Sequence, residues 1–75
     1  MNATKTFYKN VVKECEAQGI SLAELSTRLG RSRSWMSDNI RKTVGISLES
    51  AKEISDVLGV YLSCLIEDGD MNMNL

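Results

Sequence analysis

The sequence predicts an all-α fold, a compact bundle of about five short helices that contains a helix-turn-helix. Two observations lead to this prediction. Apolar side chains recur every three or four residues along most of the 75-residue chain, which is the spacing of one helix face. Serine and glycine residues stand at the ends of these periodic stretches, where helices commonly begin and end. We expect residues 1–67 to form one domain and residues 68–75, which lack the periodicity, to form a flexible tail.

A first helix is expected over about residues 3–17. Phe7, Val11 and Cys15 recur every four residues, so they share one face of such a helix. Gly19 follows shortly afterwards, at a position where a helix commonly ends.

Two shorter helices are expected at about residues 22–29 and 33–42, joined by a turn at Gly30. Ser21 stands three residues before Glu24, a capping box that satisfies the open N–H groups of a first turn. Gly30 can take the positive φ that ends a helix cleanly. Ser32 is expected to cap the second of these helices, and the apolar stripes are Leu22, Leu25 and Leu29 in one and Trp35, Met36 and Ile40 in the other.

The last two helices are expected at about residues 48–58 and 61–67, the earlier one capped by Ser47. In the connector that precedes them, either Val44 or Ile46 is expected to tuck under the domain. The apolar positions of the two helices are Leu48, Ala51, Ile54 and Leu58, then, after Gly59, Leu62, Leu65 and Ile66.

Charge is distributed unevenly, although the net charge is only −1. Residues 1–27 are balanced, residues 28–42 carry five basic side chains against one acidic, and residues 43–75 carry one basic against six acidic. The local field governs attraction to phosphates more than the net charge does. Residues 28–42 are therefore a candidate surface for nucleic acid; the alternative is a solvated cationic face without a partner.

The composition argues against an enzyme and against a metal ion or other cofactor. There is no histidine, the commonest general base, and Cys15 and Cys64 do not have the spacing of a metal-ligand pair. We interpret both cysteines as reduced, buried apolar groups. The apolar runs are too short to span a bilayer and the N-terminus lacks the apolar core of a signal peptide, so no membrane partner and a cytoplasmic location are expected.

Three phrases of the sequence carry a resemblance to a known family. In this order and spacing, SLAELSTRLG, RSRSWMS and ISDVLGVYLSCLI resemble the lambda-repressor-like family of helix-turn-helix regulators, which includes phage repressors and Cro proteins. Together they cover residues 20–67. The resemblance implies a sequence-specific transcriptional regulator of a phage or mobile element, which inserts the helix at 33–42 into the major groove of double-stranded DNA.

Three departures from the family pattern concern the edges of this motif. Tyr61 stands where such proteins often carry a polar cap for the last helix. Ile40 follows Met36 by four residues where many relatives keep a spacing of three, which could lengthen the recognition helix by part of a turn. The connector TVGIS lacks the usual polar, glycine-containing loop. These departures bear on phosphate contacts beyond Lys42, not on the fold.

The leading residues of a groove-bound helix point at base edges. Arg33 is the strongest candidate, because its planar fork can donate twice to O6 and N7 of guanine. Asp38 could accept from N4 of cytosine, or it could orient Arg41 or Arg33 through a hydrogen bond. The candidate base contacts are Ser32, Arg33, Ser34, Ser37 and Asp38.

Phosphate contacts are expected from the first amides of the helix at 22–29, because oriented N–H groups attract anions, and from polar and basic side chains around the motif. Met36 is expected in the core. Trp35 is expected either half-buried against the helix at 48–58 or in contact with the DNA backbone or a thymine methyl group. The candidate phosphate contacts are Ser21, Arg31, Arg41, Lys42 and Thr43.

The resemblance also implies a homodimer on a palindromic operator. Tyr61, Leu62, Leu65 and Ile66 are the candidate interface, unless their apolar side chains close the core instead. A second hypothesis starts from the acidic segment 43–75, which could pair with the basic DNA-binding domain of a repressor protein. The chain would then be an antirepressor.

Overall fold

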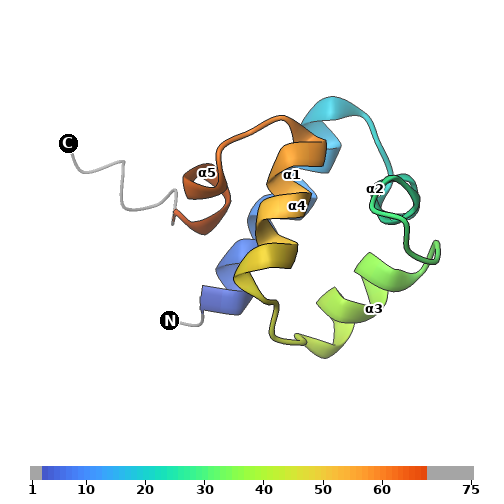
Figure 1. Cartoon of the computed structure of the whole chain (residues 1–75), viewed down its shortest axis with the longest axis horizontal. Coiled ribbons are helices and arrows are strands. Elements are labelled where there is room, and N and C mark those ends of the chain that lie inside the picture. Colours follow the sequence, from blue (N-terminus) through green and yellow to red (C-terminus); the bar gives the residue numbers. More distant parts are fainter. Residues whose placement is uncertain (1–2, 68–75) are drawn as a thin grey trace.

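Within residues 3–67, which the computed structural model describes, the chain folds into five helices and no strand. The predicted all-α class is therefore confirmed. The expected tail at residues 68–75 lies outside the described residues. The helices are α1 (Ala3–Gln18), α2 (Leu22–Arg28), α3 (Trp35–Lys42), α4 (Leu48–Leu58) and α5 (Leu62–Ile66), as Figure 1 shows.

The core forms along the apolar face of α1, as its four-residue periodicity predicts. α1 packs against α5 and α2, and α4 packs against the same two helices, so the four enclose one apolar interior. The buried apolar residues are Phe7, Tyr8, Val11, Cys15, Leu25, Met36, Ala51, Ile54, Leu58 and Leu65.

Polar side chains of α1 satisfy backbone carbonyls at the ends of other elements. The hydroxyl of Tyr8 donates to the carbonyl of Val44, just after α3. Asn10 donates through Nδ2 to two carbonyls near the end of α5, at 2.8 and 2.7 Å, and Gln18 donates through Nε2 to the carbonyl of Leu58 at 2.6 Å. The last carbonyls of a helix have no partner inside the helix. These hydrogen bonds therefore supply partners for such carbonyls and fix α1 against the ends of the neighbouring helices.

At the start of α4 the predicted cap is confirmed, but the predicted burial of Leu48 is wrong. The hydroxyl of Ser47 accepts from the N–H of Ser50 at 3.1 Å, as expected of an N-cap. Leu48 was expected on the buried face, yet 75% of it is exposed, because the first residue of α4 lies at the rim of the domain. In the preceding connector, Ile46 packs against the core, whereas Val44 is 43% exposed.

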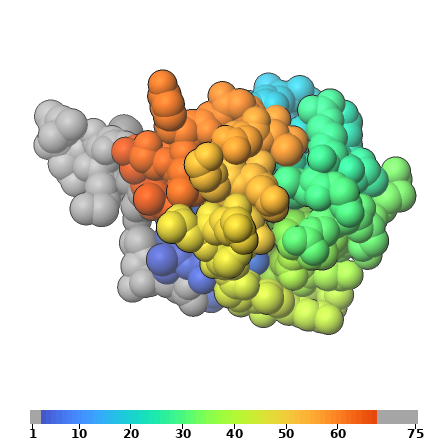
Figure 2. Space-filling view, viewed as in Figure 1, coloured from blue at the N-terminus to red at the C-terminus, as the bar shows by residue number. Residues whose placement is uncertain are grey.

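The helices divide the molecule into two ends. α3 packs against α2, and these two helices lie together at one end, whereas α5 lies at the opposite end beside α1 (Figures 1 and 2). α2 is seen almost end-on in Figure 1 while α3 lies across the view, so their axes run in clearly different directions. α2, its turn and α3 thus form a helix-turn-helix at one end of the bundle, where α2 also packs against α1 and α4.

Candidate nucleic-acid interface

α2 begins and ends where its local sequence predicts. The hydroxyl of Ser21 accepts from the N–H of Glu24 at 3.0 Å, while the carboxylate of Glu24 accepts from Arg28 one turn on rather than returning to the cap. At the other end, Gly30 has φ +75°, and the N–H of Arg31 bonds back to a carbonyl of α2 at 2.9 Å. This is the Schellman arrangement for which glycine is favoured.

α3 begins two residues later than expected, and Ser32 does not cap it. The helix starts at Trp35; Arg33 and Ser34 form the turn before it, and Ser34 occupies the cap position without a side-chain cap bond. The reason is a contact from α2, where the buried hydroxyl of Ser26 accepts the N–H of Met36 at 3.0 Å. A buried acceptor from another helix thus takes the place of a local cap.

Most of the candidate base-contacting residues lie on the surface of one short segment. Ser32, Arg33, Ser34 and Ser37 are exposed. Ser37 is partly engaged, since its hydroxyl donates to the carbonyl of Ser34 at 3.1 Å. Arg33 lies in the turn just before α3 and, among the arginines of the described chain, it alone has neither an ion pair nor a stacking partner.

Asp38 is half-buried and is engaged with a basic neighbour. Its carboxylate accepts from Nη2 of Arg41 at 2.8 Å, one helical turn on. The hydrogen bond from Arg41 is the largest cause that lowers the pKa of Asp38 below its ordinary value, and a hydrogen bond with Ser34 and the charge of Lys42 act in the same direction. Of the two alternatives for Asp38, this geometry matches the one in which it orients Arg41.

Arg31 and Trp35 form a stacked pair at the turn between α2 and α3. The guanidinium carbon of Arg31 lies 4.9 Å from the centre of the Trp35 ring, within the range of a cation–π contact. Trp35 is half-buried and packs against the core. Arg31 itself is exposed, so its charge is held at a defined place on the surface.

The other candidate phosphate contacts flank α3 and the start of α2. Ser21, Arg41 and Lys42 are exposed, and Thr43 is half-buried. Thr43 caps the end of α3 in the left-handed conformation with φ +50°, and the N–H of Val44 closes the cap on the carbonyl of Asn39 at 3.0 Å. α3 therefore ends at Lys42, where the sequence predicts its end.

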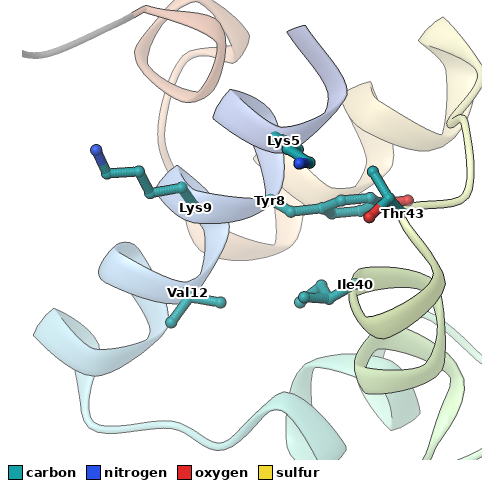
Figure 3. A pocket seen from close by; sticks show the side chains of 6 residues that line it. All are labelled: Lys5, Tyr8, Lys9, Val12, Ile40 and Thr43. Carbon is teal, nitrogen blue, oxygen red and sulfur yellow. The ribbon is translucent and has the colours of Figure 1, made fainter. Parts of the chain in front are cut away.

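Sequence reasoning missed two lysines of α1 that lie beside the end of α3. Lys5 and Lys9 line an open groove of about 310 Å³ together with Ile40 and Thr43 (Figure 3). The four-residue spacing of the two lysines places them on one face of α1, but no local signal says that this face meets α3. Only the packing of the helices brings Lys5 and Lys9 to the groove beside α3, and the ammonium of Lys9 points away from α3 in Figure 3.

The candidate partner surface on α5 is split between core and solvent. Leu65 is only 1% exposed and belongs to the core, and Leu62 packs against the core as well. Tyr61 and Ile66 are 81% and 59% exposed. The exposed apolar surface left on α5 is therefore smaller than expected.

The prediction of two buried cysteines is right for Cys15 but wrong for Cys64, which is exposed. The reason is that Cys64 lies on the outward face of α5, next to a hollow against α4.

Comparisons of the chain with protein families, curated proteins and solved structures find no match. Within residues 3–67, no cluster of three or more Cys, Asp or Glu side chains could hold a metal ion. No helix in that part of the chain is both long and apolar enough to cross a membrane. A functional assignment must therefore come from the geometry of the exposed segment around α3.

Proposed function

We propose that the chain is a sequence-specific, double-stranded-DNA-binding regulator of transcription that inserts α3 into a major groove. The observation that carries this proposal is the exposure of Arg33, Ser34 and Ser37 around the start of α3, while Met36 between them is fully buried. Base edges are recognised by donors and acceptors that are exposed yet held in place by the fold. The resemblance to lambda-repressor-like regulators supports the same function.

The contacts of the arginines within the protein support different roles for them, with some binding phosphates and one binding a base. Arg31 is stacked on Trp35 and Arg41 is bonded to Asp38, so both are held at set positions on the surface. Such held charges suit phosphate contacts, which position a protein on the duplex without reading its sequence. Arg33 retains its full set of donors and suits a bidentate contact with guanine, worth roughly 1–3 kcal/mol of discrimination.

Selection of bound duplexes from a random DNA pool tests this proposal. We expect one enriched sequence, and we expect Arg33→Ala to lower affinity for it by about ten- to a hundredfold while affinity for a scrambled duplex changes little. Arg28→Ala is the matched control, because Arg28 is an exposed arginine of α2 already paired with Glu24. Equal loss on both duplexes would make Arg33 a phosphate contact, and no enrichment would overturn sequence-specific binding.

The same selection reports on self-association. A two-fold dimer would enrich a palindrome whose half-sites are about one helical turn apart. Tyr61 and Ile66 remain the exposed apolar candidates for its interface, and α5 lies away from α2 and α3, so pairing there would leave the DNA-binding end uncovered (Figure 1). Enrichment of a single asymmetric site would argue for a monomer.

An antirepressor is the second candidate, favoured by the charge of α4. Glu49, Glu53 and Asp56 are exposed and recur at helical spacing, which gives α4 an acidic stripe. Such a stripe is complementary to a basic DNA-binding domain. A gel-shift of the pure protein at low salt separates the two candidates: binding to duplex DNA supports the regulator, while its absence together with co-purification of a repressor supports the antirepressor.

A further inference from the structure

The groove between α1 and the end of α3 has a basic rim and an apolar floor. Lys5 and Lys9 are exposed and stand one turn apart on α1, while the floor is built from Tyr8, Val12 and Ile40 (Figure 3). Among residues 3–67, those that line the groove include no acidic side chain. We call Lys5 and Lys9 the lysine rim.

The lysine rim joins the basic end of α3. Arg41 and Lys42 are exposed in the last turn of α3, and Thr43, which follows them, lines the same groove as the two lysines. The acidic residue of that helix, Asp38, is already bonded to Arg41. Positive charge therefore continues from α3 across the groove onto α1.

α1 is itself polarised, which the zero net charge of residues 1–27 conceals. Lys5 and Lys9 lie in its first half, whereas Glu14 and Glu16 lie in its last turns. The bond from the Tyr8 hydroxyl to the segment after α3 holds the first half of α1 beside α3. The fold thus turns the basic half of α1 toward the helix-turn-helix.

We propose that the DNA contact extends onto α1, where Lys5 and Lys9 bind backbone phosphates that flank the sequence read by α3. This inference rests on the proposed function and adds a second contact region to it. Residues four apart on a helix are separated by about 6 Å along its axis, and each DNA strand carries a phosphate about every 3.4 Å of its axis. This spacing is compatible with contacts from both flexible lysine side chains to phosphates of one strand.

The test compares salt dependence in two double variants. Lys5→Gln/Lys9→Gln removes the lysine rim, and Lys13→Gln/Lys52→Gln removes the same charge elsewhere. Lys13 is exposed on α1 but does not line the groove, and Lys52 faces Asp56 on α4. Affinity is measured for the duplex enriched by selection, with about ten base pairs of random flank on each side, and circular dichroism checks that each variant keeps its helices.

Loss of two phosphate contacts should make the negative slope of log affinity against log salt shallower by about 2. Between about 50 and 200 mM salt, the loss of affinity should then be about tenfold smaller for the rim variant than for the wild-type chain. The control variant should keep the wild-type slope. Trimming the flanks should make the wild-type slope shallower as well and leave that of the rim variant unchanged.

Two results would overturn the inference in distinguishable ways. If the rim variant binds with the wild-type slope, or if the control variant loses as much, α1 lies outside the interface although the proposed function stands. If the wild-type chain binds no duplex at any salt concentration, the proposed function fails and the flanking contact fails with it.

Discussion

The hydroxyl oxygen of Ser26 on α2 lies 3.0 Å from the backbone nitrogen of Met36 on α3 and accepts its hydrogen bond. The same hydroxyl donates to the carbonyl of Leu22 at 2.8 Å, so one buried side chain joins two helices. Both Ser26 and Met36 are fully buried. Since Ser34 supplies no side-chain cap, this contact both begins α3 and sets its position against α2.

We therefore expect Ser26→Ala to destabilise the fold by about 1–3 kcal/mol, the cost of leaving a buried N–H without an acceptor. The change should also loosen the start of α3, so the amide of Met36 should exchange with solvent faster relative to amides of α1. Urea unfolding and native-state hydrogen exchange measure the two effects. Ser55→Ala is a matched control, because Ser55 is also buried but donates only within α4. Equal effects of the two substitutions on Met36 exchange would show that the contact does not anchor α3.

Thr43 adopts the left-handed conformation with φ +50°, which costs an L-residue roughly 1–2 kcal/mol and glycine almost nothing. Thr43→Gly should therefore stabilise the protein by up to about 1 kcal/mol, after the added entropy of the unfolded chain is subtracted. The midpoint of urea unfolding should rise with an unchanged slope. Thr27→Gly, inside α2, should destabilise the protein instead, by about 0.3 kcal/mol from helix propensity alone. A lower midpoint for Thr43→Gly would contradict the strain argument.

The carboxyl group of Asp38 should titrate below its ordinary pKa, because Arg41 donates a hydrogen bond to its charged form. A folded-state pKa that lies below the unfolded value stabilises the fold above the unfolded pKa, and this contribution disappears as pH falls through the folded pKa. NMR titration of the Asp38 side chain measures the shift. Arg41→Ala should return the pKa toward its ordinary value, and Lys42→Ala should change it less. An unchanged pKa in Arg41→Ala would show that the ion pair does not persist in solution.

The two cysteines should differ sharply in reactivity. Cys15 is buried, and burial together with the nearby charge of Glu14 raises the pKa of its thiol, so little of the reactive thiolate is present. Cys64 is exposed. A thiol reagent should label Cys64 at once in the native protein and Cys15 only after unfolding, and Cys64→Ser should abolish the fast phase. Rapid labelling of both thiols would show that α1 opens readily from the core.

The positions of most helix ends were predictable because their signals are local. Ser21 and Ser47 accept amide bonds from the first turns that follow them, and Gly30 and Gly59 take positive φ where α2 and α4 end. A cap requires only a few consecutive residues, so short sequence patterns contain the needed information. The start of α3 was not predictable in this way, since its acceptor, Ser26, lies ten residues earlier on another helix.

Burial along the amphipathic helices was predictable only in part. The periodicity of α1 identifies the buried face with Val11 at its centre, because one whole side of that helix is covered. In α4 and α5 the same pattern does not tell which apolar positions are buried, since Leu48 is exposed and Leu65 is buried. Coverage there depends on which neighbouring helix reaches the residue, and a periodic pattern does not contain that information.

The sequence by itself determined the helical class, the caps, the turn at Gly30 and the concentration of arginine around α3, because each depends on neighbours within a turn or two. Tertiary structure alone decided that α3 begins at Trp35 and that Lys5 and Lys9 stand beside the end of α3. These features arise where helices dock. Their free energies depend on the packed arrangement as a whole.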